Sequence, residues 1–153
     1  MSKETEKSIQ ELMSKNMLTN DVLVVGKDID ILLNNFESYS LTTYGIEYNS
    51  VLFRKGMEGK HLIMHGPITS DVIKNFKRGC FDIIYVNNIK CCINNFDLFF
   101  STIKQFMHQH SNLYINIIGL NKEYFYTLQE DLRKHGMKLV KVTTHVKINL
   151  KND

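Results

Sequence analysis

The sequence predicts an α/β fold: a three-layer sandwich with a mostly parallel sheet, flanked by helices and closed by a C-terminal antiparallel hairpin. Short apolar runs alternate with segments whose apolar residues recur at helical spacing. The last segment, 137–150, holds two extended runs around Thr143 and Thr144, which is typical of a hairpin. Parallel strands need helical crossovers that cover both faces of the sheet, so such strands can be apolar throughout.

Apolar runs that end at a glycine or a polar residue predict the parallel strands. These runs are Val22–Val25, Leu41–Ile46, His61–Met64, Phe81–Val86 and Leu113–Ile118. In open sheets of this kind, ligands bind beyond the carboxyl ends of the strands, at the point where the strand order reverses. The residues that follow the strands are therefore the first candidates for a functional site.

Helical spacing appears between these strands. Asp28, Ser70 and Asn121 each stand where a helix begins and are residue types that cap a helix. A longer helix is predicted from about Asn95, with one apolar face formed by Phe96, Phe99, Phe100, Ile103, Phe106 and Met107. His108 and His110 follow near the predicted C-terminus of that helix, where the dipole favours imidazolium. Their spacing does not suit a shared metal ion.

The length of 153 residues fits one domain, predicted at 21–153, preceded by a helix at 1–20. That helix has one apolar face, which suits packing on the domain or a homodimer contact. No segment approaches the roughly 20 apolar residues of a membrane span. The N-terminus is charged and unlike a signal peptide, so a cytoplasmic location is expected.

Charge and cysteine content narrow the function classes further. The net charge is only +3 and is spread along the chain, so nucleic-acid binding is not indicated. Cys80, Cys91 and Cys92 form no CxxC pair, and their number is odd. Neither a disulfide framework nor a metal site is therefore predicted.

The order of these elements and several motifs resemble the class I S-adenosylmethionine (SAM) methyltransferases. The similarity covers roughly residues 18–150, and its best segment is Phe81-Asp-Ile-Ile-Tyr-Val-Asn-Asn-Ile. It continues through Asn94-Asn-Phe-Asp97 into the long helix, and then into the strand at Leu113. The resemblance implies a Rossmann-like sheet with SAM as the cofactor.

The resemblance also implies roles for residues at the first two strand ends. The family binds the ribose hydroxyls of SAM through an acid at the end of its second strand, which is Glu47 here, followed by Tyr48. A carboxylate has two acceptor oxygens, which match a vicinal diol. Of the family's G-x-G-x-G loop only Gly26 remains. Lys27 is a candidate for the SAM carboxylate and Asp28 for its ammonium group; alternatively, Asp28 caps a helix and Lys27 faces water.

The third and fourth strand ends supply the remaining candidates. Family members commonly have Gly-Asp after the third strand, whereas this chain has Gly66-Pro67-Ile68, and Ile68 is placed to pack on adenine. Asn87 ends the fourth strand as a ligand-facing residue. The catalytic residues stay open, with His65 as the one histidine to test as an acid or base.

Two function classes follow from these motifs. The first is a SAM-dependent methyltransferase that acts on a small or unidentified acceptor. The second is a catalytically inactive methyltransferase-like domain that serves as a binding or scaffold subunit, which the altered glycine loop and Pro67 favour. The expected partners are accordingly a small-molecule acceptor or a partner protein subunit.

Overall fold

The computed structural model describes residues 19–26, 29, 32–33, 40–47, 62–65, 79, 81–87, 96–117, 121–142 and 145–150. The helix predicted at 1–20 and the one predicted after Ser70 lie outside these residues. Gly79, the predicted end of the second helix, is described, and it has the positive φ, +63°, that a glycine at a helix end commonly adopts. The strands and helices, in chain order, are β1 (Thr19–Gly26), β2 (Ser40–Glu47), β3 (Leu62–His65), β4 (Phe81–Asn87), α6 (Phe96–Lys104), β5 (Met107–Asn116), α7 (Lys122–Lys134), β6 (Met137–Val142) and β7 (His145–Leu150).

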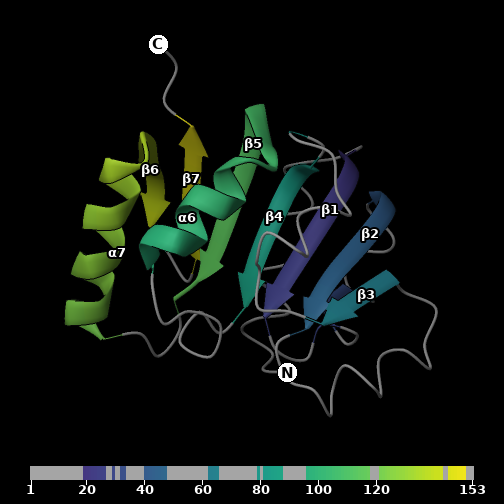
Figure 1. Ribbon diagram of the computed structural model, residues 1–153, viewed down its shortest axis with the longest axis horizontal. Coiled ribbons are helices and arrows are strands. Elements are labelled where there is room, and N and C mark those ends of the chain that lie inside the picture. Colours follow the sequence, from purple (N-terminus) through teal and green to yellow (C-terminus); the bar gives the residue numbers. More distant parts are fainter. Residues whose placement is uncertain are drawn as a thin grey trace.

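The described strands form one seven-stranded sheet in the order β3-β2-β1-β4-β5-β7-β6 (Figure 1). The strands from β1 to β5 run parallel to one another, as the alternation of apolar runs and helices predicts. β7 runs antiparallel to both β5 and β6, and residues 143 and 144 between β6 and β7 lie outside the described part of the chain. The strand order reverses at β1, because β2 and β4 pair with its two sides.

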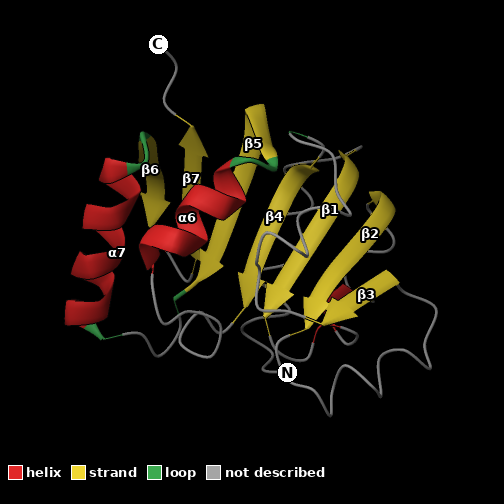
Figure 2. Cartoon of the chain, in the orientation of Figure 1, coloured by secondary structure: helices red, strands yellow, loops and turns green. Residues whose placement is uncertain are grey.

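Side chains pack against both faces of this sheet. One apolar cluster joins Leu23 and Val25 of β1 to α6 and α7, which lie on the same side of the sheet (Figure 2). A second cluster, on the other face, joins Val22 and Val24 to the helical residues at 29, 32 and 33. Because β1 is covered on both faces, all four of its central residues are buried, as its uninterrupted apolar run predicts.

His135 ties the end of α7 to α6. Its Nε2 atom lies 2.7 Å from Asp97 Oδ1, and its ring packs on Phe100. Its backbone carbonyl accepts a hydrogen bond of 2.7 Å from Lys104 Nζ, so a lysine of one helix stabilises the C-terminus of the other. Asn121 caps the start of α7, where its side chain accepts from the N–H of Tyr124 as predicted. None of the described helices is long and apolar enough to cross a bilayer.

The long helix predicted from Asn95 ends earlier than expected. α6 stops at Lys104, and its last turn tightens: the N–H groups of Gln105 and Phe106 donate to carbonyls three residues back. Phe106 and Met107 are both buried, but as a turn residue and as the first residue of β5. The helical spacing therefore misled the prediction, because burial in a turn produced the same pattern.

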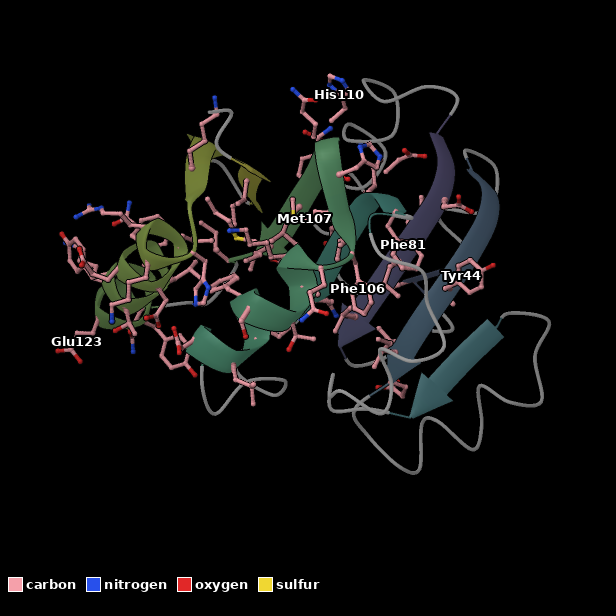
Figure 3. The ribbon with its side chains drawn as sticks, turned by 45° about the horizontal axis from the view of Figure 1, so that its top comes forward. Tyr44, Phe81, Phe106, Met107, His110 and Glu123 are labelled. Carbon is pink, nitrogen blue, oxygen red and sulfur yellow. The ribbon has the colours of Figure 1, made fainter. Side chains whose placement is uncertain are left out.

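β5 begins at Met107, not at Leu113 as predicted, and its first half is irregular. The register with β4 passes from Phe81↔Met107 to Ile83↔Asn112, so residues 108–111 bulge opposite Asp82. His108 and His110 belong to this bulge and not to a helix C-terminus, which corrects the sequence-based placement. Figure 3 shows His110 beyond the end of the sheet where the parallel strands begin.

The bulge is held by polar contacts. The Ser111 hydroxyl donates to the Phe81 carbonyl at 2.6 Å and accepts the N–H of His108 at 2.8 Å. His108 Nε2 lies 2.8 Å from Asp82 Oδ1, and its Nδ1 accepts the N–H of His110. Both ring nitrogens of His108 are therefore engaged in fixing the strand start, and the Ser111 hydroxyl pairs with two backbone groups.

Replacing Ser111 with alanine is expected to lower the free energy of unfolding by about 1–3 kcal/mol, because the hydroxyl pairs two backbone groups at a site with no solvent exposure. Urea unfolding of the variant measures the loss. Ser101→Ala is the control, since the Ser101 hydroxyl bonds one carbonyl of its own helix at an exposed site. Equal midpoints for the two variants would contradict the role given to Ser111.

Candidate functional site

The carboxyl ends of the parallel strands meet along one edge of the sheet. The backbone register places Gly26 beside Glu47 on one side and beside Asn87 on the other. It also places His65 beside Glu47. Four strand ends predicted from sequence to face a ligand therefore lie in one row, at the position where the strand order reverses.

Gly26 occupies the centre of this row because no larger residue fits there. Its φ is +137°, and a Cβ atom built on it would lie 2.0 Å from the backbone oxygen of Asn87. The end of β1 thus approaches the end of β4 more closely than a side chain allows. The glycine is required by the contact between these two strands, whatever the ligand.

Glu47 ends β2 with its carboxylate inside the protein. The residue is only 2% exposed, and its Oε1 atom accepts the backbone N–H of Ile29 at 3.3 Å. Ile29 is buried and helical, so the carboxylate contacts the helical segment that follows β1. A negative charge at the start of a helix is favourable. The Glu47 side chain is therefore not a solvated acid at a strand end.

Asn87, at the end of β4, contacts a polar residue of the next strand. Its Oδ1 atom accepts a hydrogen bond of 3.2 Å from Nδ2 of Asn116, the last residue of β5. The side chain of Asn116 is also hydrogen-bonded to Tyr85. Burial raises the pKa of the Tyr85 hydroxyl far above its usual range, and the bond to Asn116 acts against that rise.

Solved structures share this arrangement of strands and helices. A Methanococcus maripaludis protein assigned as a SAM-dependent methyltransferase matches with a TM-score of 0.77 at 9% identity, over 97% of this chain and 85% of that protein. A Staphylococcus aureus protein assigned as a caffeoyl-CoA O-methyltransferase gives a TM-score of 0.70 at 15% identity, over 99% and 85% of the two chains. The ribosomal protein L11 methylase from Lactobacillus delbrueckii subsp. bulgaricus gives 0.70 at 13% identity, over 97% and 80%.

The chain has the fold of class I SAM-dependent methyltransferases. The structural match extends over nearly the whole chain, as the order of elements in the sequence predicts. Neither a protein-family model nor a curated protein matches the sequence. At these low identities the similarity establishes the methyltransferase fold, and the chemistry must be argued from the residues of this chain.

Two of the described residues, Gly26 and Glu47, have properties that suit an adenosyl group. Gly26 lets the backbone come close at the strand reversal, since a Cβ atom would fill that space. Glu47 places a carboxylate next to it in the register. A carboxylate offers about four lone pairs, so the bond to Ile29 and bonds to a diol are compatible. At these two points the described residues fit the ribose of SAM.

The other predicted cofactor residues of the methyltransferase fold, Lys27, Asp28, Tyr48 and Ile68, lie outside the described residues. His65 is placed by its backbone alone, next to Glu47 at the end of β3. Among the described residues, no three histidine, cysteine, aspartate or glutamate side chains are grouped so as to hold a metal ion.

Asn116 lies at the same edge as Asn87 but was not predicted as a site residue. The predicted strand, Leu113–Ile118, put the asparagine inside the strand and not at its end. β5 instead ends at Asn116. A signal was present, because an asparagine between apolar residues is unusual in a strand covered on both faces.

Proposed function

We propose that this chain is a SAM-dependent methyltransferase that binds SAM across the carboxyl ends of β1, β2 and β4 and acts on a small-molecule acceptor. The observation that carries the proposal is the buried Glu47 carboxylate, in register with Gly26 at the strand reversal of a methyltransferase fold. A buried carboxylate at the start of a helix suits a neutral diol, whose two hydroxyl groups donate hydrogen bonds to it without adding a second charge.

In this proposal the chain acts by binding and alignment. When bound, SAM supplies a methyl group on a positively charged sulfur atom, which an acceptor nucleophile can attack. Glu47 would hold the ribose hydroxyls, and Asn87 would bind a second part of the cofactor. Methyl transfer depends mainly on proximity, alignment and exclusion of water, so a strong general base is not essential. His65 is the candidate acid or base, next to Glu47 on the side away from β4.

A second candidate function is a binding or scaffold subunit without catalysis. Two observations favour it: the loop after β1 keeps only Gly26 of the family's glycines, and the N–H of Ile29 already bonds to Glu47. In this form the chain would act with a partner subunit or as a homodimer, and the fold would provide the binding surface.

SAM binding separates the two candidates. If the first is right, SAM at 100 times its dissociation constant should stabilise the fold by about 2.7 kcal/mol, because it binds only the native state. Thermal unfolding and isothermal titration calorimetry with SAM and S-adenosylhomocysteine measure this. ATP at the same concentration is the control for non-specific adenine binding. No shift and no heat with millimolar SAM would remove the methyltransferase function and leave the scaffold function.

A further inference from the structure

The bulge at the start of β5 is closed by a hydrogen bond between two of its own residues. Nδ1 of His108 accepts the backbone N–H of His110 at 3.1 Å. This is the bond of an Asx turn, in which a side-chain acceptor binds the N–H two residues further along, here with an imidazole nitrogen in place of an oxygen. Gln109 and His110, the tip of the bulge, are exposed, and His110 lies beyond the end of the sheet (Figure 3).

That bond determines where the proton of the neutral His108 ring lies. A backbone N–H only donates, so Nδ1 must offer its lone pair and cannot carry a proton. The proton of the neutral imidazole is therefore on Nε2, which donates it to Oδ1 of Asp82 at 2.8 Å. The other oxygen of that carboxylate, Oδ2, accepts the backbone N–H of Asp21 at 3.3 Å. The bond from His110 thus exists only while Nδ1 of His108 is unprotonated.

A second proton on His108 acts differently on its two bonds. Protonated Nδ1 is a donor, so it can no longer accept the N–H of His110. The contact of Nε2 with Asp82 becomes an ion pair and is retained.

The other titratable residues around the ring do not reverse this result. Asp21 of β1 bonds through its N–H to the carboxylate of Asp82, so it keeps that acceptor in place beside His108. The His110 ring has its centroid 6.4 Å from that of His108, and two charged rings repel each other. Protonation therefore releases the tip of the bulge while its first residue stays bound to β4.

We propose that His108 is a proton-sensitive switch: the neutral ring holds the tip of the bulge, and the imidazolium releases it. Histidine is the side chain that changes charge between about pH 5 and pH 8. The bond that is broken is exposed, so water replaces the lost acceptor at little cost. The surface at this end of the sheet thereby changes both shape and charge with pH.

The switch is independent of the proposed function. β5 runs from Met107 to Asn116, with the bulge at its start, whereas Asn116 at its other end contacts Asn87 of the candidate site. Failure of the protein to bind SAM would overturn the proposed function and leave the switch unaffected.

Nuclear magnetic resonance of the full chain tests the switch. At neutral pH the ring nitrogen signals of His108 should show the proton on Nε2; a proton on Nδ1 would overturn the inference. On acidification, exchange of the His110 amide with water, relative to an unstructured chain at the same pH, should become about 2- to 10-fold faster, as expected for the loss of one hydrogen bond. This change should have the same midpoint as the titration of the His108 ring.

Two variants separate the effect of His108 from that of its neighbour. His110→Ala keeps the N–H at position 110 and removes the second ring, so this amide should still follow the titration of His108. His108→Asn puts a side-chain oxygen where Nδ1 lies, and this oxygen accepts the same N–H at every pH. The relative exchange rate of the amide at position 110 should then be constant.

His135 is the matched control in the same spectra. Its Nε2 atom lies 2.7 Å from Oδ1 of Asp97, but no described residue donates a hydrogen bond to its Nδ1 atom. Its titration should leave the amide of Met137, two residues later, unchanged. An amide at position 110 that does not follow His108, or that responds equally in His108→Asn, would overturn the switch. The measurements on the parent protein give this answer even if a variant does not fold.

Discussion

Replacing Gly26 with alanine is expected to lower the free energy of unfolding by about 4 kcal/mol or more, enough to prevent folding of a marginally stable domain. The new Cβ atom would lie 2.0 Å from the backbone oxygen of Asn87, inside any van der Waals contact. Neither atom can move alone, because β1 and β4 are joined by the register from Val22↔Ile83 to Gly26↔Asn87. The φ of +137° adds strain for any L-residue.

The chain contains matched controls for this prediction. Gly79 and Gly136 also have positive φ, of +63° and +67°, but a Cβ atom at either would lie no closer than 3.6 Å to its nearest neighbour. Alanine at those positions should cost only about 1–2 kcal/mol, the cost of the left-handed backbone. Urea unfolding of the three variants gives the comparison. A Gly26→Ala protein as stable as the other two would mean that the ends of β1 and β4 are not in close contact.

The Gly26 result also bears on function. In the family, the first loop glycine is expected because the cofactor approaches the backbone there. In this chain the approach of Asn87 requires the glycine without a cofactor. Survival of Gly26 alone is therefore consistent with both a methyltransferase and an inactive relative, and the other site residues must decide between them.

The parallel strands could be predicted from the sequence because burial on both faces demands apolar side chains at every position. Val22–Val25 and Ile83–Val86 show this directly, since all of them are buried. The strand ends then followed from the first glycine or polar residue. Gly26, Glu47 and Asn87 are each the last residue of their strand, one step after the predicted run.

The start of β5 could not be predicted, because its residues satisfy two patterns at once. Phe106 and Met107 continue the helical spacing of Phe99, Phe100 and Ile103, yet they are buried from a turn and from a strand. The bulge depends on the Ser111 contact with the Phe81 carbonyl, a pair 30 residues apart in sequence. No local pattern contains that contact, and Asn116 was missed because the same strand was given the wrong bounds.

The burial of Glu47 and its contact with Ile29 also could not be predicted from the sequence. Its place at the end of β2 could be predicted from the run Leu41–Ile46, but its contact with Ile29 joins residues 18 apart in sequence, and no local pattern contains it. That contact gives the glutamate a role in stability before any ligand binds.

Replacing Glu47 with alanine is expected to lower the free energy of unfolding by about 2–3 kcal/mol in the absence of ligand. The change removes the hydrogen bond that the buried N–H of Ile29 donates to the carboxylate, and with it a negative charge at the start of a helical segment. Desolvation of the carboxylate works in the opposite direction. Glu47→Gln separates these effects, because glutamine keeps an acceptor oxygen and loses the charge.

Urea unfolding of the ligand-free variants measures this part. Glu123→Ala is the matched control: Glu123 lies in the first turn of α7 but is exposed, and its loss should change stability by no more than about 1 kcal/mol. If Glu47→Gln is more stable than the parent protein, the cost of desolvating the carboxylate exceeds the favourable effect of its charge. The glutamate then lowers the stability of the fold, which supports a role in function.

Binding of SAM decides what that function is. If Glu47 holds the ribose hydroxyls, Glu47→Gln should weaken SAM binding by about 1–3 kcal/mol even where the fold is intact, because one charged acceptor for the diol is lost. Titration calorimetry of the folded variant, with Glu123→Ala beside it, gives the number. If Glu47→Gln binds SAM as the parent does, the carboxylate does not hold the ribose, which must bind elsewhere. If stability and binding both fall, one buried side chain contributes to both the fold and cofactor binding, since the same carboxylate bonds to the N–H of Ile29 and to the ribose.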